Sequence, residues 1–302
     1  MDFRLLEIDD CALLKEYLAR RERTACQENV ATTFIWATHF QTHFYVTEEW
    51  FFLRNTWRDR YSFAFPIGGR EADLAGAIAA MRSWCRGEGQ SLALWGLTTE
   101  QKDELEAACP GMFDFSPVRN GWDYVYDAHR LAELTGNKMH GKKNHINRFL
   151  KENKDWQFEI FGEENRAEVR RMHDEWRRRH GCEDLESLQA EYCAVERCLL
   201  HYRALNVMGG VLRVNGEAAA FSLASPLSAD CFDIHVEKAF SDMPGAYQLI
   251  NREMARLILR LHPEVKWLNR EDDAGDEGLR RAKLSYRPDM MVEKYMAGAR
   301  DE

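Results

Sequence analysis

The sequence lacks any long apolar run and has few cysteines for its length. No stretch approaches the ~18 uncharged residues of a membrane span, and residues 1–21 are charged and helix-like rather than signal-like. The 8 cysteines among 302 residues form no CxxC pair and fall far below the density of a disulfide scaffold. We therefore expect a soluble, cytoplasmic protein whose thiols are free and mostly buried.

Apolar side chains are abundant, at 45% of the residues with 12% aromatic, so the chain can bury the core of one large or two ordinary domains. The net charge of −9 repels nucleic acid and anionic lipid at long range. Residues 138–154 depart from this average, because they carry six Lys or Arg and one acid. A local basic site is therefore compatible with the acidic whole.

The predicted elements follow a similar order in the two parts of the chain. The first part is read as helix 9–23, strands 49–54 and 61–66, helix 71–86, strand 92–95, helix 99–108 and strand 122–126. The second is read as helices 139–153, 163–180 and 185–203, strands 210–214, 218–224 and 231–236, helix 245–261, strand 265–269, helix 276–286 and strand 291–295. Asn215-Gly216 is a hairpin signal. This order predicts two α/β units, residues 1–130 and 131–302, with a polar linker near 127–137.

Two segments of the second part place polar side chains where a ligand could bind. In strand 231–237, Asp233, His235 and Glu237 alternate with apolar residues and share one face, which we expect to be wet; an ordinary solvent-facing edge is the alternative. Residues 269–273 follow an apolar strand, and ligands gather at the carboxyl ends of strands. Asn269, Arg270, Glu271 and Asp272 are therefore candidates, although an acidic turn that caps the next helix remains open.

The basic segment and the start of helix 245–261 are candidate anion sites. Lys142, Lys143, Asn144 and Arg148 could hold phosphates, with a solvated helix face as the alternative. Helix amides near Gly245, Ala246 and Tyr247 could bind an anion, although a plain helix start explains the same residues. No His or Cys spacing is typical of a metal centre, so no metal is expected.

Two strings resemble a known family: Gly141-Lys-Lys-Asn-His-Ile-Asn-Arg-Phe149, and Asn269-Arg-Glu-Asp-Asp-Ala-Gly275 continuing through Leu279 to Pro288. They are similar to the C-terminal catalytic domain of phosphatidylglycerol lysyltransferase, and the resemblance covers nearly the whole chain. It implies an α/β (α+β) fold of tandem GNAT-like acyltransferase domains, with mixed central sheets flanked by helices as in Fem-type enzymes. The membrane-spanning half of the lipid-modifying enzymes has no counterpart here, so the acceptor stays open.

The resemblance also implies roles for particular residues. GNAT enzymes commonly place a proton-donating tyrosine where Tyr286 lies, and their strand at 231–237 borders the reaction cleft, so His235 or Glu237 is the implied base. Their cofactor pyrophosphate lies at the helix start occupied by Gly245, although the glycine-rich consensus of acetyl-CoA users is missing. Lys283 would hold a phosphate or carboxylate, beside Asn269.

These observations predict an acyltransferase that moves an aminoacyl group from aminoacyl-tRNA to an amine or hydroxyl acceptor. Acyl-CoA as the donor, or a non-catalytic binding protein with a degenerate cleft, are the alternatives. No tightly bound cofactor is expected, and aminoacyl-tRNA or acyl-CoA acts as co-substrate. The partners would be a tRNA acceptor end or CoA, together with a small-molecule, lipid head-group or peptide acceptor.

Overall fold

The computed structural model describes residues 1–136, 139–180 and 186–300, and the chain divides into two compact units. Unit 1 consists of Met1–Asp123, Asp272–Arg280 and Met291–Glu302, and unit 2 of Tyr124–Glu271 and Arg281–Met290. The first division lies seven residues before the boundary expected after residue 130. The last part of the chain, however, is shared between the units.

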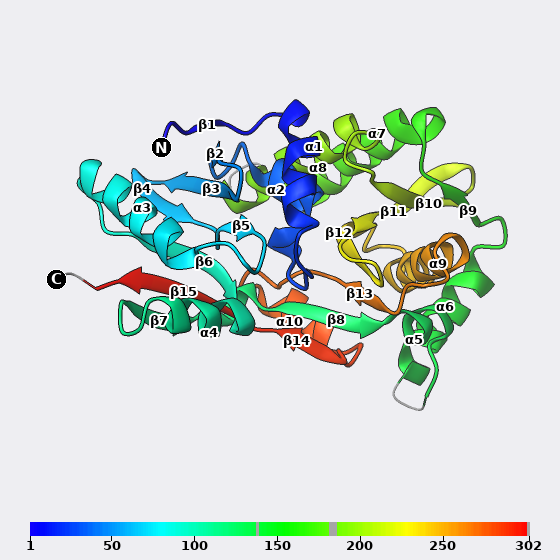
Figure 1. Ribbon diagram of the computed structural model, residues 1–302. Helices are drawn as coiled ribbons and strands as arrows, with labels where there is room; N and C mark the ends of the chain where they lie inside the picture. Colours follow the sequence, from blue (N-terminus) through cyan, green and yellow to red (C-terminus); the bar gives the residue numbers. More distant parts are fainter. Residues whose placement is uncertain (137–138, 181–185, 301–302) are drawn as a thin grey trace. The chain divides into compact units, whose positions relative to one another are not determined.

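In the described residues, unit 1 is built on a mixed eight-stranded sheet (Figure 1). In hydrogen-bonded order its strands are β1 (Arg4–Leu5), β2 (His43–Val46), β3 (Trp50–Trp57), β4 (Arg60–Phe63), β6 (Ala93–Thr98), β15 (Lys294–Ala299) and β7 (Phe113–Pro117), with β5 (Ile67–Gly68) paired to β3. Its helices are α1 (Cys11–Leu18), α2 (Val30–Trp36), α3 (Leu74–Gly87) and α4 (Thr99–Ala108), with short 3-10 helices at Ile8–Asp10, Cys26–Glu28 and Arg119–Gly121. The apolar side of α3, including Ile78 and Met81, packs with Phe63 and Leu94 of the sheet.

The second sheet belongs almost entirely to unit 2; it has seven strands over the described ranges and is also mixed. Their hydrogen-bonded order is β14 (Met290–Val292), β8 (Asp123–Asp127), β13 (Trp267–Asn269), β12 (Cys231–Ala239), β11 (Glu217–Pro226), β10 (Met208–Val214) and β9 (Gln157–Ile160). The helices are α5 (Ala128–Glu133), α6 (His140–Glu152), α7 (Glu163–Arg179), α8 (Glu186–His201) and α9 (Ala246–Leu261), while α10 (Glu277–Leu284) crosses the division at 280/281. Each described helix is too short or too polar to cross a membrane.

Several predicted elements are confirmed in detail. Helix α4 has the bounds predicted from the sequence, and its N-cap Thr98 accepts a hydrogen bond from the Gln101 amide. The β10–β11 hairpin turns at Asn215 and Gly216, whose φ angles are +53° and +80°. Two positive φ angles in succession are what a type I′ turn requires, and asparagine followed by glycine adopts them at little cost.

The strand predicted at 291–295 is wrong in its extent and its placement. The structure has two strands there, and β15 pairs antiparallel with β6 and β7 of the first sheet. Ala297 of β15 is fully buried in the unit 1 core. The pattern of apolar residues predicts a strand, but it does not say which edge the strand will join.

The linker expected at 127–137 is also wrong over most of its described length. The side chain of Asp127 accepts a hydrogen bond from the Arg130 amide and so caps α5, whose buried residues are Ala128, Leu131 and Ala132. This short helix packs against α9. It was missed because six residues are too few to show a helical period.

His173 of α7 is a buried histidine that no described residue hydrogen-bonds. Its ring stacks on Tyr192 of α8 at a centroid distance of 5.1 Å. Burial, reinforced by the Lys238 ammonium, lowers the pKa of His173 to about 4. The imidazole is therefore neutral in the folded protein at neutral pH, whereas the unfolded chain binds a proton with a pKa near ~6.5.

We expect this difference to destabilise the protein as the pH falls. The contribution of neutral His173 to the free energy of unfolding is complete above the pKa of the unfolded chain and is lost as the pH falls from ~6.5 to ~4. The free energy of unfolding should therefore decrease by about 2 kcal/mol between pH 7 and pH 5. Urea unfolding at both pH values measures it. His173→Phe keeps an aromatic ring and removes the titrating group, so its free energy of unfolding should decrease by about 2 kcal/mol less than that of the wild type over the same pH range. An equal decrease in the variant and the wild type would contradict the assignment.

Candidate functional site

The site in unit 2 lies where β12 runs parallel to β13 and the chain leaves β13. Asp233 is the register partner of Asn269, which brings the middle of β12 beside the segment Arg270-Glu271. Strand β12 is also bulged against β11: Leu223 pairs with Val236 and Ala224 with Ile234, so His235 has no opposite residue. A bulge of this kind redirects side chains.

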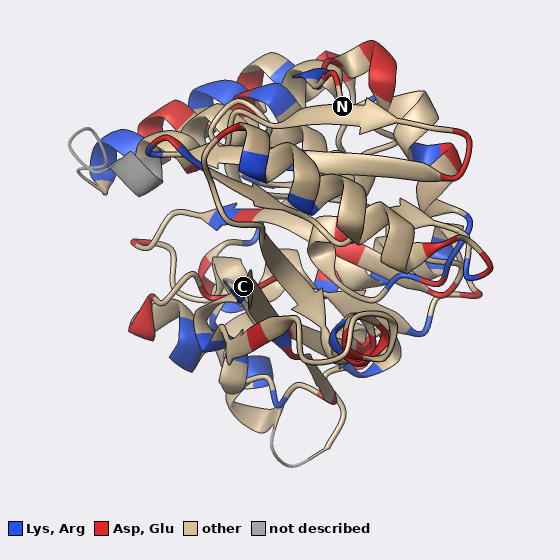
Figure 2. Ribbon diagram, turned by 60° about the vertical axis from the view of Figure 1, so that its left-hand side comes forward, with Lys and Arg blue, Asp and Glu red and all other residues tan. Residues whose placement is uncertain are grey.

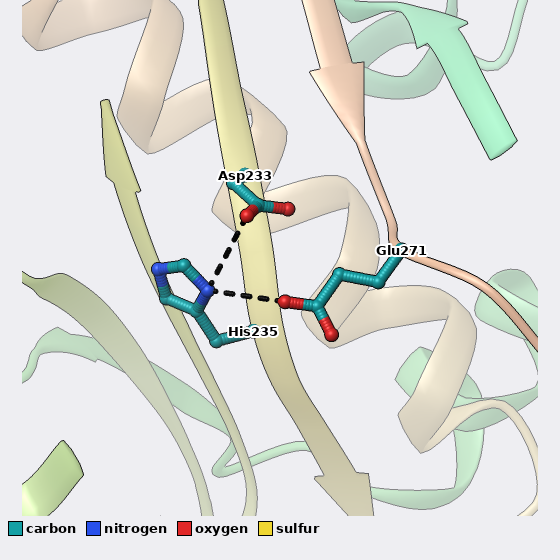
Figure 3. Close-up of side chains that lie close together, drawn as sticks. All are labelled: Asp233, His235 and Glu271. Carbon is teal, nitrogen blue, oxygen red and sulfur yellow. Dashed lines mark hydrogen bonds and ion pairs between the residues drawn. The ribbon is translucent and has the colours of Figure 1, made fainter. Parts of the chain in front are cut away.

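Three side chains converge at this bulge (Figure 3). His235 Nδ1 lies 3.2 Å from Glu271 Oε1 and 3.6 Å from Asp233 Oδ2. The other ring nitrogen, Nε2, lies 2.8 Å from Ser225 Oγ on β11. The side chains of His235 and Asp233 have an exposed fraction of 0%, and that of Glu271 has 18%. The expectation of a wet face is thus wrong for His235, because the bulge encloses it in a polar cluster.

Glu237, the next residue on that face, belongs to a second cluster. Its two oxygens accept hydrogen bonds from Arg270 Nη2 at 2.8 Å and from the side-chain Nδ2 of Asn251, on α9, at 3.0 Å. The guanidinium of Arg270 lies 5.0 Å from the Tyr286 ring centroid and 5.6 Å from that of Tyr126. An ion pair that is nearly buried and flanked by aromatic faces is held in one geometry.

Tyr286 lies beside Arg270 and is 5% exposed. The pKa of its phenol is raised, mainly by burial. The negative charge of Glu237 adds to this rise, and the positive charge of Arg270 opposes it. Tyr286 therefore stays protonated at neutral pH, as a proton donor must. The charges that act on its pKa are those of Arg270 and Glu237.

Lys142 of α6 also reaches this cluster. Its Nζ donates to Ser285 Oγ at 2.6 Å and lies 4.1 Å from the Tyr286 ring centroid. Burial, together with the Arg270 charge, lowers the pKa of Lys142. This lysine was predicted to hold phosphates, and that role stays a prediction; in the structure its ammonium lies against the ring of Tyr286.

Arg270 has one hydrogen-bonding group to spare. Its Nη1 is buried and has no partner among the described residues. A buried guanidinium N–H without an acceptor costs free energy. That free energy is regained when an oxygen atom of a ligand accepts a hydrogen bond from Nη1. Arg270, Tyr286 and Lys142 thus form a donor-rich group next to the Glu237 carboxylate.

The residues predicted for the cofactor have structural partners. Lys283 Nζ donates to the Arg270 carbonyl at 2.6 Å, and the Lys283 carbonyl accepts from the Tyr126 hydroxyl at 2.8 Å. The Asn269 side chain accepts from the Glu271 amide at 2.8 Å, which shapes the turn after β13. The side chains of Lys283 and Asn269 therefore hold the backbone of Arg270 and Glu271 in place.

The start of α9 is packed tightly against α6. Gly245 has φ +99°, and a Cβ there would collide with the His145 carbonyl. Ala246 is fully buried, and the Tyr247 hydroxyl accepts from Trp176 Nε1 at 3.2 Å. The glycine is thus required by the approach of two helices, and its predicted role at a pyrophosphate stays a prediction.

The remaining predicted substrate residues separate into different surroundings. Lys143 and Asn144 are exposed on α6, while Arg148 pairs with Glu152 at 2.8 Å. Lys138, the first residue of the basic segment 138–154, lies outside the described residues. Asp272 belongs to unit 1 and accepts a hydrogen bond from the Ala274 amide at 2.9 Å. Figure 2 shows acidic and basic residues interspersed along the helices.

Sequence reasoning missed some members of the clusters. Asn251 lies on the buried side of α9, Tyr126 sits in the middle of β8, and Ser225 is in β11. Each looks like a core residue in its own element, and only strand pairing and helix packing bring them to Glu237, Arg270 and His235. A buried polar residue within an apolar helix face, such as Asn251, is the one signal that could have been followed.

The fold is that of the GNAT-type and Fem-type acyltransferases. The crystal structure of FemX aligns with a TM-score of 0.63 at 7% identity over 98% of this chain and 97% of that chain. A tandem GNAT protein from the clavulanic acid biosynthesis pathway aligns with a TM-score of 0.52 at 10% identity over 100% and 99%. The family model of the phosphatidylglycerol lysyltransferase C-terminal region matches residues 18–298, and the chain belongs to this family.

Three further proteins are similar to this chain, two of them without a known function. A conserved protein of unknown function from Bacteroides thetaiotaomicron is 30% identical, with a TM-score of 0.93 over 99% of this chain and 100% of that one. L-PGS from Bacillus licheniformis is 16% identical, with a TM-score of 0.65 over 96% and 92%. An uncharacterized protein of Mycoplasmoides gallisepticum is 24% identical over 182 residues, which are 58% of this chain; the chain spans 55% of that protein's length.

Proposed function

We propose that the protein transfers an aminoacyl group from aminoacyl-tRNA to an amine or hydroxyl acceptor. The observation that carries this proposal is the buried Arg270 with its unpartnered Nη1, held between the Glu237 carboxylate and the Tyr286 phenol. The family supplies the class of reaction, acyl or aminoacyl transfer. These three side chains provide the groups that such a transfer requires.

Each group has a chemical part in the proposed transfer. Arg270 Nη1 donates to the ester carbonyl oxygen, whose negative charge grows as the acceptor attacks the carbon; a preorganised donor in a dry site stabilises that charge. Glu237 takes the proton of the attacking amine or hydroxyl. Tyr286 gives its proton to the departing ribose oxygen when the ester C–O bond breaks. Glu237 replaces His235 as the base in this proposal, because it lies in the same cluster as Tyr286.

The choice of tRNA as the donor is based on exposed lysines of α6 and of the turn that follows it. Lys143 and Lys151 on α6, and Lys154 just after its end, are solvent-exposed and form no ion pair within the described ranges. A tRNA acceptor stem offers several phosphates to such a row, whereas CoA offers fewer. The acceptor would be a small molecule, a lipid head group or a peptide.

Binding of the donor should therefore depend steeply on salt. Log Kd for charged tRNA, measured by filter binding from low to physiological salt, should change with log salt by about 0.9 per contacted phosphate. Lys143→Ala/Lys151→Ala/Lys154→Ala should reduce that slope by about 2 to 3. The matched variant Arg203→Ala/Arg260→Ala/Lys266→Ala removes the same charge from exposed positions elsewhere in unit 2 and should leave the slope nearly unchanged.

Other outcomes favour the other functions. Saturable binding of acyl-CoA with a shallow salt slope, and none of charged tRNA, would make acyl-CoA the donor. Absence of binding by both, at low salt, would favour a non-catalytic protein. An equal change of slope in the two triple variants would show that net charge alone attracts the tRNA.

A further inference from the structure

We propose that Asp233, His235 and Glu271 bind a divalent first-row transition metal ion such as Zn²⁺. The three side chains each offer one ligand atom, and these atoms lie within 4.8 Å of one another. They come from the β12 bulge and from the turn after β13 (Figure 3). The site is distinct from the cluster of Glu237, Arg270 and Tyr286, and the inference does not depend on the proposed transfer reaction.

The spacing of the ligand atoms fits a tetrahedral ion. Ligands bound at about 2.0–2.1 Å to a tetrahedral Zn²⁺ lie about 3.3–3.4 Å from each other. His235 Nδ1 is 3.2 Å from Glu271 Oε1 and 3.6 Å from Asp233 Oδ2, on either side of that value. One imidazole nitrogen with two carboxylates is a ligand set for Zn²⁺ or Mn²⁺, whereas Mg²⁺ and Ca²⁺ prefer oxygen ligands alone.

The surroundings also orient the ligands. Ser225 Oγ lies 2.8 Å from His235 Nε2, on the ring edge opposite the carboxylates. A hydrogen bond on the second nitrogen fixes the ring and, when Nε2 carries the proton, leaves the Nδ1 lone pair directed at the two carboxylates; metal-binding histidines are commonly held in this way. With a neutral imidazole, the three side chains carry a formal charge of −2, which a divalent ion neutralises.

The same contacts resemble a Ser-His-acid triad, but the serine is in the wrong surroundings for a nucleophile. Ser225 is 2% exposed and lies inside β11, between β10 and β12. A nucleophilic hydroxyl must reach the substrate carbonyl. Glu271, on the Nδ1 side, is the most exposed of the three ligands at 18%. Entry of an ion and a water ligand from that side is compatible with this geometry.

Metal titration of the purified full chain tests the proposal. After treatment with a chelator and its removal, Co²⁺ should bind at one ion per chain and give the visible absorption of a tetrahedral oxygen and nitrogen site. Zn²⁺ should displace it in the same stoichiometry. Absence of stoichiometric binding, or an intense ultraviolet band from thiolate coordination, would overturn the proposal.

Variants locate the ion. Glu271→Gln and Asp233→Asn each remove a charged ligand, and Ser225→Ala removes the support of the ring; each should weaken binding by at least about 10-fold to 100-fold. His262→Ala is the matched control, because His262 forms a surface pair with Glu264 at 3.4 Å. Its affinity should equal that of the wild type. Equal weakening by His262→Ala and Glu271→Gln, or full affinity in both ligand variants, would reject the site.

Discussion

Tyr286→Phe should lower the rate of group transfer by about 10²-fold to 10⁴-fold, the usual cost of losing a positioned proton donor. The ring, its packing on Tyr126 and its contact with Arg270 are kept, so the protein should fold normally. Single-turnover loss of a labelled amino acid from charged tRNA, with excess protein, measures the chemical step. Thermal unfolding of the same preparation measures stability.

Tyr126→Phe is the matched control for this prediction. Tyr126 is the other tyrosine beside Arg270, but its hydroxyl donates to the Lys283 carbonyl and is committed to structure. Its loss should reduce stability by about 1 kcal/mol and change the rate far less than Tyr286→Phe. If the two variants lose the same activity, the phenol of Tyr286 is not the proton donor.

Lys294→Met should lower the unfolding free energy by about 3–5 kcal/mol, because it leaves a buried carboxylate without its cation. Lys294 Nζ lies 2.5 Å from Asp123 Oδ1, and the Asp123 side chain has an exposed fraction of 0%. Burial lowers the pKa of Lys294, but the Asp123 carboxylate outweighs this effect and the pKa is raised. The pair therefore stays charged inside unit 1. Chemical denaturation at neutral pH is the measurement.

Arg300→Met provides the comparison within the same unit. Arg300 pairs with Asp114 at 2.7 Å, and both side chains are exposed. Exposed pairs contribute about 0–1 kcal/mol, so this variant should stay close to the wild type. If Lys294→Met lowers the free energy of unfolding as little as Arg300→Met does, the buried Asp123 carboxylate does not depend on the charge of Lys294 for its stabilisation.

The sequence predicted those parts of the fold that have a local signal. Helix α4, helix α9 and the Asn215-Gly216 hairpin have amphipathic periods, caps or turn residues of their own. Strands such as β1 and β5, with two residues each, carry no such period. The partner of β15 was not predictable either, because pairing depends on which sheet edge is left open and not on the strand's own residues.

The candidate site shows the same limit. Glu237, Arg270 and Tyr286 were named from the sequence, and the structure brings these three together. Lys283 was named as well, yet its ammonium holds the Arg270 carbonyl. The convergence of Asp233, His235 and Glu271 could not be foreseen, since it depends on a one-residue bulge and on the parallel register of β12 with β13.

The position of β15 has a consequence for synthesis on the ribosome. Its residues are translated after all of unit 2, yet they lie between β6 and β7 in the sheet of unit 1. Until they emerge, the nascent first unit has two open strand edges that can pair with other chains. Unit 1 therefore cannot finish folding before unit 2 has been made, so it does not mature first as N-terminal domains usually do.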